Sequence, residues 1–188
     1  MNYIFNEEIP SYTGINIITE VLGHVNMIKP KIVLEIMPGC GPISWHILKN
    51  NDYIKTYDVV DTWHGGKNFL RKHGLDGRIS KSLFLIYNHE FKNKINTYQE
   101  DCMKFTPQKE YDLWVLCHDA SEDFYKNEKE IIYNNFENLI SKIHKDSYIL
   151  FYATKTCREE YTKALNLILK NNILNLVEKS NNCILFKK

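Results

Sequence analysis

The sequence lacks several features that assign a protein to a class at once. Its 188 residues contain no apolar run of about 18 residues or more, so no transmembrane helix is expected. Neither sign of charge dominates, with 24 Lys and Arg against 23 Asp and Glu, so nucleic acid is not indicated as the main partner. The N-terminus, MNYIFNEEIP, is acidic and lacks the basic and apolar regions of a signal peptide. These absences predict a cytoplasmic protein without a membrane partner.

The cysteines and histidines also lack the spacing of a disulfide framework or a metal site. The five cysteines are scattered, odd in number and without a C-x-x-C pair, which is typical of reduced thiols in an intracellular protein. The histidines show no zinc-ligand spacing. No G-x-x-x-x-G-K-[S/T] sequence is present, which excludes a P-loop. With 44% hydrophobic residues at this length, we expect a single domain over residues 1–188.

Strand-like and helix-like segments alternate along the chain. A helical stripe covers residues 15–28, and an apolar run then leads from Ile32 to Glu35. Six further strands are predicted at residues 53–60, 95–99, 111–117, 147–153, 173–178 and 183–186. Further helices are predicted within residues 43–49, 67–94, 122–144 and 158–170. This order predicts an α/β fold with a mostly parallel seven-stranded sheet, helices on both faces and a C-terminal antiparallel hairpin.

Carboxylates follow four consecutive strands of this predicted sheet. Glu35 lies at the end of the first strand, Asp61 at the second, Asp101 at the third, and Asp119, beside His118, at the fourth. Ligands of such folds bind outside the carboxyl ends of the strands, so these side chains are candidates for one site. Each acid alone also fits a solvated loop, whereas an acid at every strand end favours a ligand.

A glycine turn connects the first strand to the helix that follows it. The turn reads Pro38-Gly39-Cys40-Gly41-Pro42, and glycine allows the backbone to pass close to a ligand. The next helix begins with N–H groups that lack intrahelical partners. The same pattern also fits a strand-to-helix turn that binds nothing, so the turn alone leaves both interpretations open.

The residues after the second and third strands suit an adenosine. Asp61 stands 22 residues after Gly39, close to the ~20-residue spacing at which an acid binds ribose hydroxyls. The Trp63 ring is a candidate platform for adenine, or else a lid residue that packs on the core. Asp101 and the Cys102 N–H are candidates to bind the edge of the base. Asp58 competes with Asp61 for the ribose, although it would lie inside its strand.

The charge of Glu35 separates two adenosine cofactors. NAD would bring a doubly negative pyrophosphate to the glycine turn, where a carboxylate repels it. S-adenosylmethionine instead brings a sulfonium and an ammonium group, which a carboxylate attracts. Ser44 also replaces the third glycine of the G-x-G-x-x-G dinucleotide pattern. The sequence therefore favours S-adenosylmethionine over NAD.

Three segments resemble class I S-adenosylmethionine-dependent methyltransferases. LEIMPGCGPIS resembles motif I of that family, VVDTWHGG resembles the D-T-W segment of a small-molecule branch, and YDLWVLCHDASEDFY resembles its fourth strand. The resemblance implies a Rossmann-like fold with S-adenosyl-L-methionine as the cofactor. The cofactor residues that it implies are Glu35, Met37, Gly39, Gly41, Asp61, Thr62, Trp63, Asp101 and Cys102.

The sequence departs from this family at two places. Met37 replaces the first glycine of motif I, where a side chain narrows the space for the methionine moiety or the turn takes another path. His118 and Asp119 stand where the branch has Asp-x-x-His, and either is a candidate general base. Methyl transfer by proximity alone is the alternative. Residues 151–155 lack the carboxylate of the metal-dependent members, so no metal is expected.

The sequence therefore predicts methyl transfer to a small molecule, or to a group on a sugar or a peptide. No insertion builds a substrate domain, and the first 14 residues are expected to cover the acceptor site, with Tyr12 and Thr13 as contacts. Two alternatives remain open. One is a methyltransferase-like binding module without catalysis, and the other is an enzyme that uses the same cofactor for a different reaction, such as its cleavage.

Overall fold

The computed structural model describes residues 3–6, 8–9, 13–63, 80–102, 104–117, 138–152, 166, 170 and 173–188, and the side chain of Cys117 lies outside that description. Several predictions fall outside these residues. They concern His118 and Asp119, Tyr12, and most of the helices predicted at residues 122–144 and 158–170.

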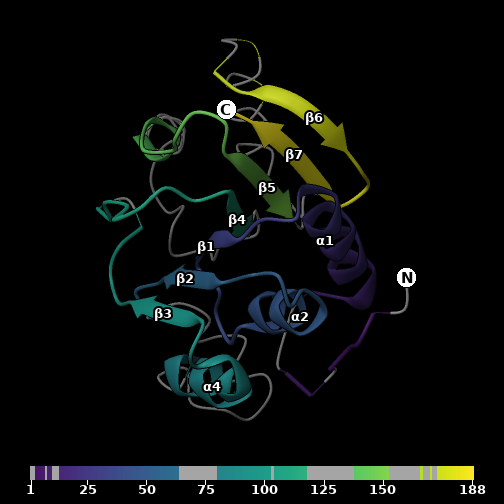
Figure 1. The fold of residues 1–188 in the computed structure, drawn as a ribbon, viewed down its shortest axis with the longest axis vertical. Coiled ribbons are helices and arrows are strands. Elements are labelled where there is room, and N and C mark those ends of the chain that lie inside the picture. Colours follow the sequence, from purple (N-terminus) through teal and green to yellow (C-terminus); the bar gives the residue numbers. More distant parts are fainter. Residues whose placement is uncertain are drawn as a thin grey trace.

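A seven-stranded sheet forms the centre of the molecule (Figure 1). Its strands are β1 Ile32–Ile36, β2 Thr56–Val60, β3 Ile95–Tyr98, β4 Leu113–Cys117, β5 Tyr148–Tyr152, β6 Asn175–Lys179 and β7 Cys183–Lys187. They lie in the order β3-β2-β1-β4-β5-β7-β6. The first five are parallel, and β7 runs antiparallel to both β5 and β6. The predicted mostly parallel sheet with a C-terminal antiparallel hairpin is confirmed.

The central strands are buried on both faces, as their apolar runs predict. In β1, Val33 belongs to one core cluster, and Leu34 and Ile36 belong to the other. Successive side chains of a strand point to opposite faces, so the two clusters are the two sides of the sheet. We call the cluster with Val33 the α1 face and the cluster with Leu34 the β3–β4 loop face, after Phe105 of that loop.

The described residues include four helical elements: α1 Ile15–Ile28, α2 Pro42–Asn50, α4 Ser80–Tyr87 and the 3₁₀ turn η2 His89–Phe91. Helices α1 and α2 lie side by side on one face of the sheet (Figure 1). Their inward apolar side chains, among them the fully buried Val25 and Ile47, join the core cluster on this face of the sheet. This packing fixes the helix that begins at the glycine turn.

The ends of two predicted elements need correction. The helix predicted to run to residue 94 ends at Tyr87, because Asn88 turns its amide back to the carbonyl of Phe84 (3.0 Å) and η2 follows. The second strand begins at Thr56 rather than at Tyr53. Tyr53 lies in a turn, where its hydroxyl binds the side chain of Asn51 (2.5 Å).

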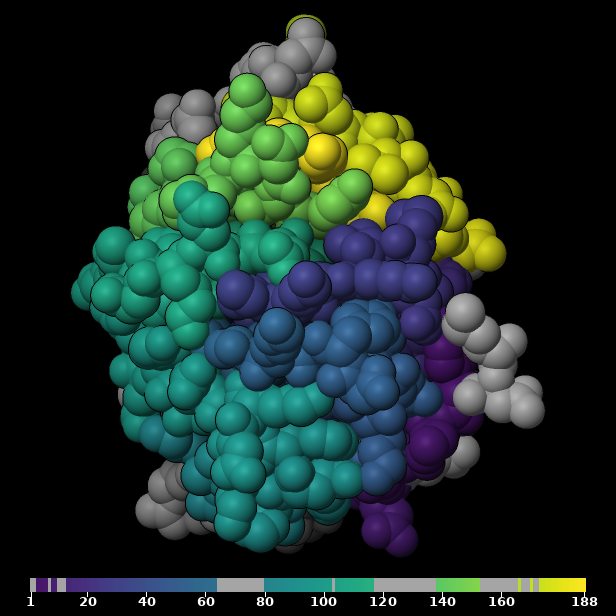
Figure 2. Space-filling view, in the orientation of Figure 1, coloured from purple at the N-terminus to yellow at the C-terminus, as the bar shows by residue number. Residues whose placement is uncertain are grey.

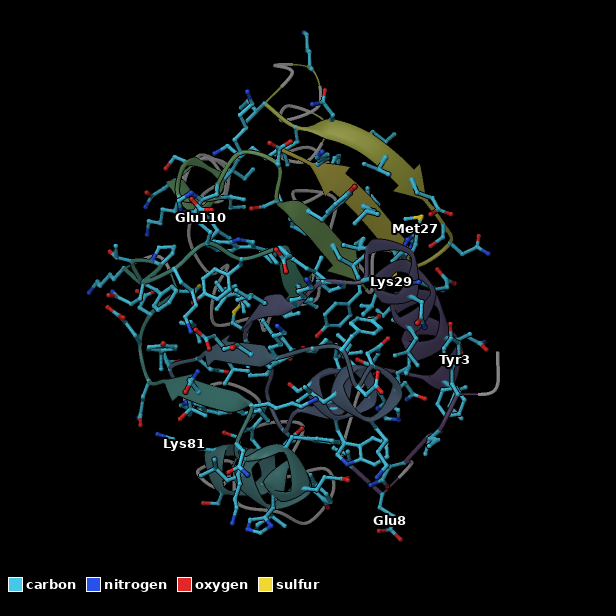
Figure 3. All side chains as sticks on the ribbon, in the orientation of Figure 1. Tyr3, Glu8, Met27, Lys29, Lys81 and Glu110 are labelled. Atoms are coloured by element: carbon cyan, nitrogen blue, oxygen red, sulfur yellow. The ribbon has the colours of Figure 1, made fainter. Side chains whose placement is uncertain are left out.

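The N-terminal segment lies along α1 and α2, as the purple atoms of Figure 2 show. Ile4 exchanges two hydrogen bonds with Asn50, and the Asn6 N–H donates to Nε2 of His46 (3.1 Å). Tyr3 lies beside α1 (Figure 3) and accepts a bond from Asn26 (3.3 Å). The segment therefore packs against the helix after the glycine turn, while its predicted role at an acceptor site stays a prediction.

Candidate functional site

The carboxyl ends of β1, β2 and β3 meet at one edge of the sheet, as the sequence predicts. Backbone hydrogen bonds join them there: Met37 N–H donates to the Val60 carbonyl (2.8 Å), and Asp61 N–H donates to the Tyr98 carbonyl (3.1 Å). The Glu100 N–H returns to the Asp61 carbonyl (3.2 Å). These bonds continue the strand pairing beyond the strand ends. They hold the first residues of the loops that carry the candidate residues in place relative to one another.

The glycine turn has three residues with left-handed backbone conformations. Met37, Gly39 and Gly41 have φ angles of 57°, 59° and 81°. The turn closes with a bond from Gly41 N–H to the Pro38 carbonyl (2.9 Å), and Pro42 then begins α2. Proline suits the first position of a helix because its missing N–H has no partner there anyway. The local sequence therefore specifies both the turn and the start of the helix.

The two glycines of the turn differ in what surrounds them. A Cβ at Gly41 would lie 2.5 and 2.8 Å from ring atoms of Phe84 and closer still to the amide of Asn88, so packing against α4 requires glycine there. A Cβ at Gly39 would meet no described atom within 4 Å. Within the described part of the chain, the half-buried Gly39 therefore leaves room beside its backbone, as an approach by a ligand requires.

Met37 has the backbone conformation that glycine adopts freely. For a residue with a Cβ, a left-handed conformation costs about 1–2 kcal/mol. Its half-buried side chain packs on the β3–β4 loop face, and its N–H is bonded to Val60. The path of the turn thus suits the glycine of motif I even though methionine occupies the position. Strain of this kind concentrates at functional sites.

Asp61 joins the loop after β1 to the loop after β2. Its Oδ2 accepts a bond from Gly39 N–H (3.3 Å), and its Oδ1 accepts one from Trp63 N–H (2.7 Å). Burial raises the pKa of Cys40 to about 11 and that of Cys102 to about 12. The charge of Asp61 adds to both shifts, after that of Asp101 in the case of Cys102. Asp61 is therefore the acid around which the predicted site residues gather.

Glu35 lies beneath the glycine turn rather than on an open surface. Its side chain is 0% exposed, and its Oε2 accepts bonds from the hydroxyls of Ser44 and Tyr57 (2.9 Å for Tyr57). Its Oε1 is buried without a hydrogen-bond partner in the described part of the chain. Burial, with a smaller contribution from Asp61, raises the pKa of Glu35 to about 7. The side chain turns inward to Ser44 of α2, and the role of Glu35 as a cofactor residue stays a prediction.

Trp63 lies in the core, which is the packing alternative of the sequence analysis. The side chain is 6% exposed, and its ring lies 5.2 Å from that of Phe84 at an interplanar angle of 57°. Its φ is 60°, and its Nε1 has no hydrogen-bond partner in the part of the chain that the structure describes. The local sequence of a tryptophan after a strand does not distinguish an adenine platform from a core position. Stacking of Trp63 on adenine stays a prediction.

The remaining candidates lie at the same edge. Thr62 and Asp101 are half-buried beside Asp61 and Cys102, and the Asp101 carbonyl accepts the N–H groups of Lys104 and Phe105 (both 2.9 Å). The Cys102 side chain is buried in the core on the β3–β4 loop face. Asp58, the competitor for the ribose, points into that face and is bonded there.

Four residues that support the site were not assigned this role from the sequence: Ser44, Tyr57, Phe84 and Asn88. Ser44 and Tyr57 bind Glu35, and Phe84 and Asn88 pack against Gly41. Their partners are distant in sequence, so no local pattern identifies them. The spacing of Ser44, which follows the glycines on the first turn of α2, offered a weak signal.

The described residues show neither a metal-binding group nor a membrane-spanning helix. They contain no group of three or more His, Cys, Asp or Glu side chains that is arranged to hold a metal ion. Within the same ranges, no helix combines the length and the apolar character needed to cross a bilayer.

Comparisons with known proteins give matches in fold. No family model and no curated protein sequence matches the chain. The N-methyltransferase NodS from Bradyrhizobium japonicum WM9 matches with a TM-score of 0.60 at 13% identity, over 93% of this chain and 97% of that one. An S-adenosylmethionine-dependent methyltransferase from Clostridium acetobutylicum ATCC 824 matches with a TM-score of 0.63 at 11% identity, over 94% of this chain and 92% of that one.

The human N-acetylserotonin methyltransferase in complex with S-adenosylmethionine matches with a TM-score of 0.58 at 11% identity, over 91% of this chain and 51% of that one. The fold is that of the class I methyltransferases. At these identities the likeness concerns the fold, so the chemistry of the site must carry any functional argument.

The residues at the carboxyl edge fit a cationic nucleoside cofactor. Gly39 leaves open space for a ligand, and Asp61 lies against it. Asp101 adds a second acid, and the unpartnered Oε1 of Glu35 adds a third beneath the turn. A set of acids beside a glycine turn attracts a sulfonium and an ammonium group and disfavours a pyrophosphate.

Proposed function

We propose that this protein is an S-adenosylmethionine-dependent methyltransferase. The observation that carries the proposal is the contact between Asp61 and Gly39 (3.3 Å) on a methyltransferase-like fold. The contact joins the ribose acid and the glycine turn that sequence spacing predicts to serve one ligand. The acids around that contact support a cation-bearing cofactor.

Each residue has a role in this proposal. Gly39 lets the cofactor approach the turn, and Asp61 accepts hydrogen bonds from the ribose hydroxyls. Thr62, Asp101 and Cys102 bind around the adenine. Bound S-adenosylmethionine supplies a methyl group on a sulfonium, which transfers to a nucleophile aligned with the carbon–sulfur bond. Proton removal from the acceptor is assigned to His118 or Asp119, or needs no protein base.

The acceptor is a small molecule, or a group on a sugar or a peptide. Two matched structures are named as an N-methyltransferase and as an N-acetylserotonin methyltransferase, which supports a small acceptor here. The N-terminal segment is the candidate cover of the acceptor site. Ile9 supports this, since it is buried against Cys40 of the glycine turn and Trp45 of α2.

Met37 favours a second candidate, a methyltransferase-like binding module without catalysis. Its side chain stands where motif I has glycine, and it retains a strained conformation there. A protein that no longer aligns a methyl donor would tolerate such a side chain. The two candidates differ in whether a product forms, so they are separable in solution.

The test is isothermal titration of the folded protein with S-adenosylmethionine, followed by assay of S-adenosylhomocysteine formation with a panel of small nucleophiles. We expect one site per chain and loss of binding in Asp61→Ala. Asp52→Ala is the matched control, because Asp52 is exposed in the turn before β2, away from this edge. Binding without product from any acceptor class would favour the binding module. No binding by the folded protein would contradict the methyltransferase.

A further inference from the structure

Glu35 is a buried acid that the proposed function leaves without a counter-charge. Its side chain is 0% exposed, so bulk water does not reach it. The two hydroxyls that bind it, from Ser44 of α2 and Tyr57 of β2, both donate to the same oxygen. The other oxygen, Oε1, has no partner among the described residues. An ionised carboxylate in this position is under-stabilised.

The charged and titratable groups that the structure describes around Glu35 do not compensate its charge. The loop after β2 presents Asp61, a second carboxylate, which disfavours a charge on Glu35. Strand β2 itself presents Tyr57, whose pKa burial raises well above its ordinary value, so it stays a neutral donor. Helix α2 presents Ser44 and carries His46, whose two ring nitrogens bind the Pro42 carbonyl and the Asn6 N–H instead.

Resting on the proposed function, we propose that Glu35 is neutral in the ligand-free protein and ionises when the cationic cofactor binds, so that cofactor binding releases a proton. The cofactor supplies the positive charge that the site lacks. The proton leaves the Glu35 carboxyl for solvent, and no bond to carbon or sulfur changes in this step. Glu35 is a positioning residue in this account, since it acts on the cofactor through charge from beneath the turn.

The direction of the pH dependence follows from linkage. Burial holds the pKa of Glu35 at about 7 in the ligand-free protein, and a bound cation lowers it. Below that pKa, binding must remove a proton, so affinity falls as the pH falls. For a group of pKa about 7 whose pKa drops by two units or more on binding, affinity at pH 6 is about tenfold weaker than at pH 8.

The experiment is isothermal titration with S-adenosylmethionine at pH 6, 7 and 8, each in two buffers of different ionisation enthalpy. The difference in heat between buffers counts the protons released. We expect release of about half a proton at pH 7 and about tenfold weaker binding at pH 6 than at pH 8. In Glu35→Gln, which keeps the shape of the side chain, we expect both effects to disappear.

The α-amino group of the cofactor titrates near pH 8. A neighbouring acid favours its charged form, so binding makes this group take up protons rather than release them, and a release that Glu35→Gln abolishes belongs to Glu35. A second variant, Tyr57→Phe, removes one bond that favours the charged carboxylate. We expect it to move the midpoint of the pH profile upward. This variant serves as the test if Glu35→Gln does not fold, as judged by circular dichroism.

The outcomes separate the inference from the proposed function. Equal proton release and equal pH dependence in the wild type and Glu35→Gln would overturn the role of Glu35 while leaving the methyltransferase proposal intact. An unchanged midpoint in Tyr57→Phe would do the same. No binding by the folded wild type at any of the three pH values would instead overturn the proposed function.

Discussion

Two carboxylates on neighbouring strands, Glu35 and Asp58, are both 0% exposed, yet they differ in their hydrogen-bond and ion-pair partners. Asp58 accepts bonds from Asn96 (2.7 Å) and Tyr111 (2.7 Å) and forms an ion pair with Lys109 (3.1 Å). A buried charge with a cation and several donors is a structural element.

Among the residues that the structure describes, Glu35 pairs with no cation, and one of its oxygens has no hydrogen-bond partner. It lies one residue before the end of β1, next to the glycine turn, whereas Asp58 lies in the middle of β2. Acids with a raised pKa concentrate at functional sites. The comparison teaches that the fold completes the interactions of Asp58 by itself and leaves those of Glu35 to be completed by a ligand.

The two glycines of the turn repeat this contrast. Gly41 is enclosed by Phe84 and Asn88, so its lack of a side chain serves packing. Gly39 faces open space and the carboxylate of Asp61, so its lack of a side chain serves a ligand.

Asp58→Ala is expected to have the largest effect on stability. It leaves the ammonium of Lys109 and the hydroxyls of Tyr98 and Tyr111 without their acceptor, which costs about 3–5 kcal/mol of unfolding free energy. Urea denaturation followed by circular dichroism measures the change. A loss below about 1 kcal/mol would show that Asp58 is not the structural acid of the pair.

Gly41→Ala is expected to destabilise the protein by about 2–4 kcal/mol. The φ of 81° disfavours a side chain, and the new Cβ collides with the ring of Phe84. Thermal and urea unfolding measure the loss. The companion variant Phe84→Ala removes the obstacle, so the two substitutions together should cost less than the sum of their separate effects.

The stability of wild type relative to Glu35→Gln is expected to depend on pH. The pKa of Glu35 is raised from 4.5 to about 7 in the folded chain. The neutral carboxyl therefore favours folding fully below pH 4.5, and this contribution is lost as the pH rises to about 7. Over that window, the variant should gain about 3 kcal/mol relative to the wild type. The check is the unfolding free energy of both proteins at pH 5, 6, 7 and 8. A difference between wild type and variant that stays constant over these pH values would contradict the raised pKa of Glu35.

Gly39→Ala is expected to have the smallest effect on stability and a clear effect on binding. The φ of 59° costs about 1 kcal/mol once a Cβ is present, and no described atom opposes that Cβ. The Cβ enters the space assigned to the cofactor, so affinity for S-adenosylmethionine should fall about tenfold or more. Unchanged affinity in the folded variant would mean that the cofactor does not approach the turn at Gly39.

The sequence predicts the features of this site that depend on local pattern. The alternation of apolar runs and helical stripes predicts the sheet, and the 22-residue spacing from Gly39 to Asp61 predicts a shared ligand for two groups that lie 3.3 Å apart. The features that depend on packing were not predictable in this way. Glu35 and Asp58 look alike in sequence. What distinguishes them is Lys109, 51 residues beyond Asp58, because no cation of the described residues takes the same place beside Glu35.

Trp63 shows the same limit of local pattern. A large aromatic residue after a strand fits an adenine platform or a core position, and Phe84 of a distant helix places it in the core. Met37 shows the reverse case, in which a backbone conformation suited to glycine is retained although the sequence has another residue.

The central claim is that the acids at the carboxyl edge of the sheet bind S-adenosylmethionine. Isothermal titration of the folded protein at pH 8, where Glu35 is ionised most readily, tests it most directly. The account predicts saturable binding to one site per chain, lost in Asp61→Ala and retained in Asp52→Ala. No heat of binding from the folded wild type at cofactor concentrations up to about 1 mM would contradict it.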